Sequence, residues 1–203
     1  MAIVFDKVTV DYGNVKPIDG MSFELPERGV CVITGESGSG KSTLLRLLSG
    51  LLQPTAGSVR GLDEYKLAYV FQEDRLLGWL SVLENLTFVN PDEEGALAWL
   101  RAMELDGFER AYPEELSGGM RRRVAIARAM HYGGSLLLLD EPFKGFDDEL
   151  KLRIAERITG RFELTVIAAH SAQDVSMLAR EGAVLTISVN GRREVAKASF
   201  KAT

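Results

Sequence analysis

The stretch Gly35-Glu36-Ser37-Gly38-Ser39-Gly40-Lys41-Ser42-Thr43 decides the fold of this 203-residue chain, because it has the pattern G-x-x-x-x-G-K-S of a phosphate-binding loop. The largely β-branched run Val30–Ile33 before it predicts a buried strand, and the leucine-rich run Thr43–Leu48 after it predicts a helix. The motif therefore has the strand–loop–helix setting that phosphate binding needs. The alternative is a glycine-rich turn that only links the two elements, and the flanking strand and helix make it the weaker interpretation.

The residues of this loop have separate tasks in holding a polyphosphate. Its glycines allow the backbone to wrap the phosphates closely, since glycine tolerates conformations closed to other residues. Backbone N–H groups of residues 38–43 then point at the phosphates, with the positive end of the helix dipole behind them. Lys41 supplies a positive charge near the β- and γ-phosphates, and Ser42 offers its hydroxyl to Mg²⁺.

The composition is that of a soluble globular protein of one domain. The formal net charge of −5 argues against a dedicated nucleic-acid binder, since such proteins are usually basic. No apolar run approaches the length of a membrane span, and no secretory signal is visible after Met1, because Asp6 interrupts the apolar residues. The single cysteine, Cys31, falls in an apolar strand and is expected to be a packed thiol in a reducing compartment.

Two acids follow a run of four leucines at Leu136–Leu139, which predicts a fully buried strand of the parallel type. Carboxylates at the end of such a strand are costly unless they are solvated, paired or bound to metal. Asp140 fits a second tether for Mg²⁺, directly or through water, and Glu141 fits a base that orients an attacking water. The alternative is that both acids only cap the next helix.

The segment Leu116-Ser117-Gly118-Gly119-Met120 opens a predicted helix at 121–130, with Ser117 as a candidate N-cap. Two glycines beside a helix start form a second possible cradle for an anion, although a simple cap explains them equally well. The run Arg121-Arg122-Arg123 is typical of a solvated helix face. Its alternative is a contact with the phosphate-binding part or with a partner chain.

Three further residues carry weak signals when each is taken alone. Tyr12 is either an aromatic that stacks on adenine or a residue of the core or rim. Gln72 ends a predicted strand, where α/β sheets present ligand-contacting groups, but a solvated loop glutamine would look the same. His170 follows the buried strand 164–169, and it either contacts the γ-phosphate at the edge of the sheet or has a structural role.

The remaining pattern predicts more strands than helices. Alternation and turn residues place antiparallel strands at 3–10 and 21–25, beside the nucleotide site. Further predicted strands are 58–60, 66–71, 183–188 and 193–196, and further predicted helices are 82–88 and 93–105.

Taken in order, these motifs resemble the nucleotide-binding domain of ABC (ATP-binding cassette) transporters over nearly the whole chain. Gly35–Thr43 is similar to the family's Walker A motif, and Leu136–Glu141 to Walker B with its glutamate. The family's signature motif matches at Leu116–Met120, which separates it from other phosphate-binding-loop proteins. The shorter matches are Tyr12 at the adenine-stacking aromatic, Phe71-Gln72 at the Q-loop, Asp147 at the D-loop aspartate and His170 at the switch histidine.

The resemblance implies an α/β P-loop NTPase fold with a mainly parallel core sheet, a small antiparallel β arm and a reduced helical subdomain. One domain would cover residues 1–203, with the helical subdomain at approximately 80–130. It further implies a head-to-tail homodimer that sandwiches two ATP molecules with Mg²⁺, each between the Walker A motif of one chain and Ser117–Gly119 of the other. Gln72 would also lie at the metal, and Asp147 near the nucleotide. Hydrolysis would drive a separate membrane permease, docked near Gln72–Trp79 on the cytoplasmic face of the membrane.

A finer resemblance is to the ATPases of nitrate-, sulfonate- and taurine-type importers, carried by Phe71–Asn85 and by Met120 in the signature motif. Gly78 departs from that group, which usually has proline there, and Lys144 stands where the family usually has serine. Two rival functions are a non-transport ABC-type ATPase and a regulatory module that binds nucleotide without turnover. A non-transport ATPase of this type would be expected to carry a coiled-coil insertion, zinc-binding cysteines or a second cassette, and this sequence has none of them. The presence of Glu141 and His170 argues against a regulatory module without turnover.

Overall fold

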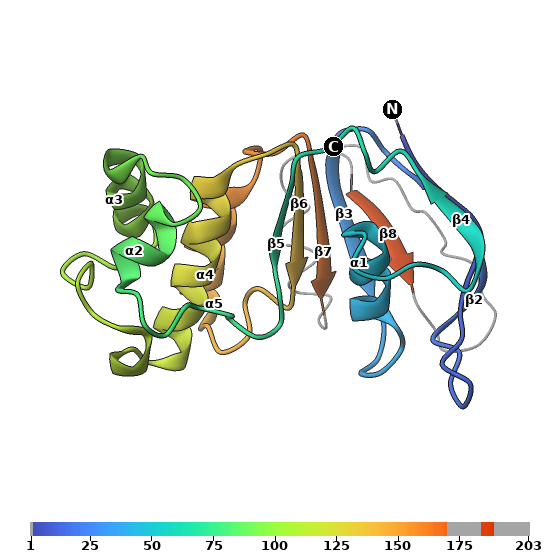
Figure 1. The fold of residues 1–203 in the computed structure, drawn as a ribbon, viewed down its shortest axis with the longest axis horizontal. Helices are drawn as coiled ribbons and strands as arrows, with labels where there is room; N and C mark the ends of the chain where they lie inside the picture. The colour runs from blue at the N-terminus through green and yellow to red at the C-terminus, as the bar shows by residue number, and fades with distance from the viewer. Residues whose placement is uncertain (1, 170–183, 189–203) are drawn as a thin grey trace.

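The computed structural model describes residues 2–169 and 184–188, and within them the chain forms two sheets (Figure 1). The larger sheet has five strands in the order β5-β6-β7-β3-β8, and every neighbouring pair is parallel. Its strands are β3 (Gly29–Thr34), β5 (Leu67–Val70), β6 (Leu136–Asp140), β7 (Leu164–Ala169) and β8 (Val184–Ser188). Both faces of this sheet are covered, which explains why β6 and β7 are continuous apolar runs without alternation.

The smaller sheet is antiparallel, with β1 (Ile3–Val10) between β2 (Ile18–Leu25) and β4 (Ala56–Arg60). Only one of its faces is buried. Along β1 the residues Ile3, Phe5, Val8 and Val10 are at most 1% exposed. The step of three residues from Phe5 to Val8 breaks the alternation of buried and exposed side chains, and an irregularity in the pairing with β2 at this point keeps Val8 and Val10 on the buried face. This sheet forms the antiparallel arm that the sequence predicts.

Helix α1 (Lys41–Leu48) fills the space between the two sheets (Figure 1). Its four leucines at positions 44, 45, 47 and 48 are at most 2% exposed, and they share one core with β1 and with the side chains of Leu136 and Leu138. This core holds the helix directly behind the loop at residues 35–40.

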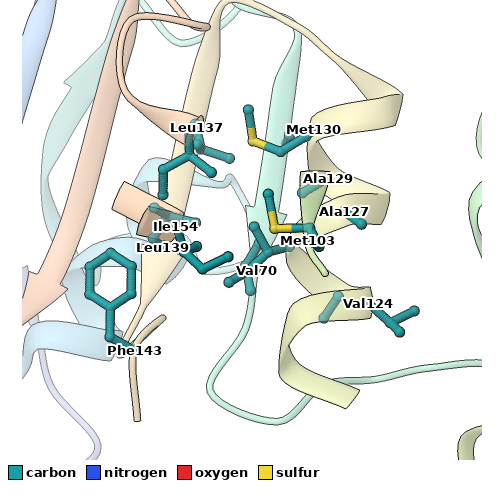
Figure 2. Packing of buried hydrophobic residues seen from close by; sticks show 14 of the residues in the cluster. Val70, Met103, Val124, Ala127, Ala129, Met130, Leu137, Leu139, Phe143 and Ile154 are labelled. Atoms are coloured by element: carbon teal, nitrogen blue, oxygen red, sulfur yellow. The ribbon is translucent and has the colours of Figure 1, made fainter. Parts of the chain in front are cut away.

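The other helices cover the opposite face of the parallel sheet. They are α2 (Val82–Thr87), α3 (Glu93–Ala102), α4 (Gly118–Tyr132) and α5 (Asp148–Ile158), with a 3₁₀ turn at Pro113–Glu115. Figure 2 shows Val70, Leu137 and Leu139 of the sheet packed against Met130 and Ile154 of the helices. Alternate leucines of β6 therefore point into two separate cores.

Capping residues set where these helices begin. Ser81 and Glu84 form a reciprocal capping box at α2, and Asp92 caps α3. Helix α4 begins at Gly118 and not at residue 121 as predicted, because Ser117 accepts a hydrogen bond from the N–H of Met120. Helix α3 ends at Ala102 and not at residue 105, and its end is followed by Glu104 with a left-handed φ of 56°.

Most predicted strands are confirmed with shifts of a few residues at their ends. Helix α5 was not predicted. The predicted strand at 193–196 and His170 lie outside the described residues. Across the described part of the chain, no helix has both the length and the apolar character needed to cross a membrane.

Candidate nucleotide site

The loop between β3 and α1 has the backbone of an anion cradle. Gly38 and Gly40 have φ angles of 77° and 109°, in the left-handed region that favours glycine. A Cβ atom at Gly40 would lie 2.8 Å from the carbonyl oxygen of Pro17, so the following helix can begin here only from a glycine. Helix α1 then starts at Lys41, with the N–H of Leu44 donating to the Gly40 carbonyl at 2.9 Å.

Lys41 is only 5% exposed and lies over the loop that precedes it. Its Nζ donates to the carbonyl oxygens of Gly35 at 2.8 Å and Glu36 at 2.9 Å. The ammonium group therefore holds the loop in its curve and stands at the concave side of the motif. A phosphate held by the loop amides would meet this charge directly.

Asp140 lies at the end of β6, beside the first turn of α1. Its carboxylate accepts a hydrogen bond from the Ser42 hydroxyl, and its Oδ1 atom is buried without a partner among the described residues. Burial raises the pKa of this carboxyl, while the bond from Ser42 opposes the shift. A hydroxyl beside an unsatisfied carboxylate oxygen fits Mg²⁺, which takes few protein ligands and completes its shell with water and phosphate oxygens. The described residues contain no group of three or more His, Cys, Asp or Glu side chains that could hold a metal ion.

Glu141 continues from β6 in a strained backbone conformation, with φ of 50°. Its N–H donates to the carbonyl of Ala168 at 3.1 Å, which ties it to the end of β7. The side chain is 13% exposed, and its Oε2 atom lies 4.0 Å from Nζ of Lys144. The unusual Lys144 thus stands beside the acid that sequence analysis assigns as the base.

Most of the other predicted site residues are exposed to solvent, and one of them caps a helix. Tyr12 is 56% exposed, and Gln72, Ser117 and Gly118 are exposed as well. Asp147 caps α5, where its Oδ1 accepts from the N–H of Leu150 at 2.8 Å. The structure brings Lys41, Ser42, Asp140 and Glu141 to one edge of the sheet, but Ser117–Gly119 stand on the helices of the opposite face (Figure 1).

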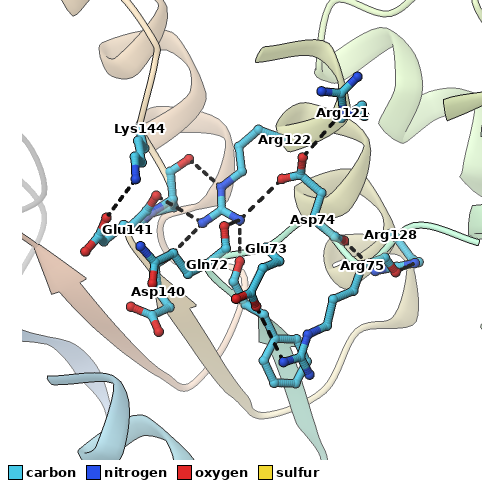
Figure 3. A network of polar contacts seen from close by, with 12 residues as sticks. Gln72, Glu73, Asp74, Arg75, Arg121, Arg122, Arg128, Asp140, Glu141 and Lys144 are labelled. Carbon is cyan, nitrogen blue, oxygen red and sulfur yellow. Dashed lines mark hydrogen bonds and ion pairs between the residues drawn. The ribbon is translucent and has the colours of Figure 1, made fainter. Parts of the chain in front are cut away.

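Arg122 and Asn85 are buried polar residues whose individual structural roles the sequence patterns did not predict. Of the two alternatives for residues 121–123, the solvated face is wrong for Arg122 and the contact with the phosphate-binding part fits it. Arg122 is 4% exposed and donates to the backbone carbonyls of Asp140 and Gln72 (Figure 3). Asn85 is fully buried and bonded to the loop at 77–81. An asparagine inside an apolar helical pattern was the available signal for Asn85, whereas the basic run did not indicate which of its three arginines is buried.

Comparison with known proteins places this geometry in a family. Residues 18–144 match the family model described as ABC transporter. A taurine import ATP-binding protein of Rhizobium johnstonii is 37% identical over 205 residues, which cover 92% of this chain and 78% of that protein. An aliphatic sulfonates import ATP-binding protein of Shouchella clausii is 40% identical over 149 residues, which cover 72% of this chain and 60% of that protein. The chain thus spans between 60% and 78% of the length of these two relatives.

Solved structures agree with the family match. The ATP-binding cassette MJ0796, in a dimeric post-hydrolysis state bound to ADP and Pi, aligns with a TM-score of 0.78 and 25% identity, covering 97% of this chain and all of that one. A second dimeric structure of the same cassette aligns with a TM-score of 0.76 and 26% identity, covering 92% of this chain and 94% of that one. The predicted α/β cassette fold, with its parallel sheet and small antiparallel sheet, is confirmed. The chain belongs to the ABC transporter family and is one of its ATP-binding, ATP-hydrolysing domains.

Proposed function

We propose that this chain is the ATP-hydrolysing subunit of an importer and works as a head-to-tail homodimer around two Mg-ATP. The observation that supports the proposal is the placement of the two candidate anion-binding segments at the carboxyl edge of one sheet but over its opposite faces. The loop at residues 35–40 leads into α1 on one face, and Ser117–Gly119 open α4 on the other. Because the sheet separates them, one nucleotide can meet both cradles only if a second copy supplies one of them. The dimeric structures of MJ0796 support this arrangement.

Within each site the residues divide the work of an in-line attack of water on the γ-phosphate. Lys41 and the amides of Gly35–Thr43 stabilise phosphate charge, and Glu141 polarises the attacking water. Ser42, Asp140 and Gln72 would hold Mg²⁺, directly or through water, and the ion would neutralise charge on the phosphates when bound. Tyr12 would stack on the adenine, and Gln72 and His170 would help to orient the γ-phosphate. Ser117–Gly119 and Asp147 would complete the site across the dimer interface.

A surface on the helical side provides a docking place for a membrane permease. Trp79, which is 75% exposed, ends the segment Gln72–Trp79, and Phe88 at the end of α2 is 71% exposed. Large exposed aromatic side chains are typical of interface anchors. We place the permease over Gln72–Trp79, the subunit on the cytoplasmic face of the membrane, and the helical subdomain at about 80–130 within a single domain. The names of the relatives favour import, within the sulfonate and taurine group.

The test is gel filtration of Glu141→Gln with and without Mg-ATP, together with phosphate release. The variant should keep ATP binding, lose about 10²–10⁴-fold in turnover, the usual contribution of a general base, and shift from monomer to dimer when ATP is added. A persistent monomer with ATP demonstrably bound would contradict the sandwich. Wild-type-like turnover would remove Glu141 from its role, and a wild-type chain that binds ATP without turnover would favour the regulatory module.

A further inference from the structure

Arg122 has the most extensively bonded side chain near the candidate site (Figure 3). Its Nε atom donates to the carbonyl of Pro142 at 3.2 Å, and Nη2 donates to the carbonyls of Asp140 and of Glu141, the latter at 3.0 Å. Nη1 donates to the carbonyls of Phe71 and of Gln72, the latter at 3.4 Å. A guanidinium group has five N–H donors in a rigid plane, and a buried one must satisfy them.

The acceptors belong to two segments of chain that are far apart in the sequence. One follows β5 and carries Gln72, and the other follows β6 and carries Glu141. These strands are direct neighbours in the sheet, so their continuations leave the same edge side by side. Arg122 lies between the two continuations and is paired with Asp74 at 3.5 Å, which offsets its buried charge. One side chain therefore bridges the backbone at Gln72 and the backbone at Glu141, just beyond the last paired residues Val70 and Leu139.

The segment after β6 depends on this support. Glu141 has a φ of 50°, and a non-glycine residue holds such a conformation only where its surroundings enforce it. Three successive carbonyls, those of residues 140, 141 and 142, point to the one guanidinium group. Without these bonds the carbonyls would be buried beside an apolar core, and the backbone would relax. The direction of the Glu141 side chain would then change with it.

We propose that Arg122 is a positioning residue for ATP hydrolysis, which holds the Glu141 backbone in its left-handed conformation and at a fixed distance from Gln72. The inference rests on the proposed role of Glu141 as the base. Lysine cannot replace arginine here, because a single ammonium group cannot donate in several directions across the plane of a fork. Arg122 also stands about one helical turn after Ser117–Gly119, so it links Glu141 to the segment that would meet the partner's nucleotide.

The test combines Arg122→Lys with Glu141→Gln, using the full chain. In the wild-type background Arg122→Lys should lower kcat by about 10²-fold, the effect of a misplacement on the order of 1 Å, while ATP affinity stays within about twofold. In the Glu141→Gln background the same change should lower the residual single-turnover rate by less than about threefold, because the group that Arg122 positions has already lost its function. Arg122→Gln repeats the comparison if a buried lysine prevents folding.

The matched control is Arg128→Lys. Arg128 lies on the same helix and donates to the carbonyls of Asp74 at 3.1 Å and Arg75 at 2.9 Å, but within the described part of the chain it makes no hydrogen bond to residues 140–142. Any decrease in the hydrolysis rate that Arg128→Lys causes should be the same factor in the wild-type and in the Glu141→Gln background. Equal losses from Arg122→Lys in both backgrounds, or an unchanged kcat with an active wild-type chain, would overturn the proposal. An inactive wild-type chain would instead overturn the proposed function.

Discussion

Replacing Asn85 by alanine should destabilise the helical side of the protein without touching the nucleotide site. Asn85 is fully buried in α2. Its Nδ2 atom donates to the carbonyls of Leu77, Leu80 and Ser81 at 3.0–3.1 Å, and its Oδ1 atom accepts from the N–H of Leu77 at 2.8 Å. One amide side chain therefore bonds to four backbone groups of the loop before α2, in Leu77, Leu80 and Ser81.

The expected loss follows from counting satisfied groups. The two amide protons and the one acceptor make about three effective hydrogen bonds, each with a net contribution of about 1 kcal/mol. The variant should lose about 3 kcal/mol in the free energy of unfolding. For a domain of this size that corresponds to a decrease of about 6–12 °C in Tm. The loop carries the exposed Trp79, so its order, and with it permease docking, should suffer as well.

Urea unfolding followed by circular dichroism measures the change, with calorimetry of ATP binding on the same sample. Asn14→Ala, at an exposed position, is the control and should change stability by less than about 0.5 kcal/mol. A loss below about 1 kcal/mol for Asn85→Ala would refute the counting of hydrogen bonds. If Asn85→Ala weakened ATP binding by about as much free energy as it costs in stability, the expectation that the loop before α2 does not affect the nucleotide site would be refuted.

Two further predictions concern charge. Lys41→Ala should abolish measurable nucleotide binding by calorimetry while the fold is retained, since its ammonium group lines the phosphate loop; unchanged affinity would count against the whole site. Hydrogen bonds from Arg153 and then Arg157 hold the pKa of Glu104 below its usual 4.5, so this carboxylate stabilises the fold above that pH and loses the contribution as pH falls through its lowered pKa. Glu104→Gln should therefore lower the free energy of unfolding by less than about 1 kcal/mol at pH 7 and leave it unchanged in strong acid, as measured by urea unfolding at both pH values. A loss of stability that is larger in acid than at pH 7 would contradict the prediction.

Much of the site could be predicted because its residues are determined locally. The turn at Gly38–Gly40 requires positive φ angles, and only a glycine fits beside Pro17. The leucines of β6 predict a strand that is covered on both faces. Because β3, β7 and β6 are parallel, the acids after β6 lie at the same carboxyl edge of the sheet as the loop that follows β3. Sequence patterns of this kind report short-range backbone geometry and local burial, and those are what the chain encodes within a few residues.

Tertiary structure decided the rest, and Arg122 is the plainest case. Arginine in a basic run is typical of a solvated helix face, and nothing near it in the sequence predicts burial. Its acceptors come from residues 18 to 51 positions away along the chain, and they meet only because β5 and β6 pair in parallel beside α4. The placement of Ser117–Gly119 over the face opposite to the phosphate loop has the same origin. The sequence by itself determined which groups can bind phosphate and metal, while the packing of distant segments decided which of them face each other, because a sheet separates its two faces only once it has formed.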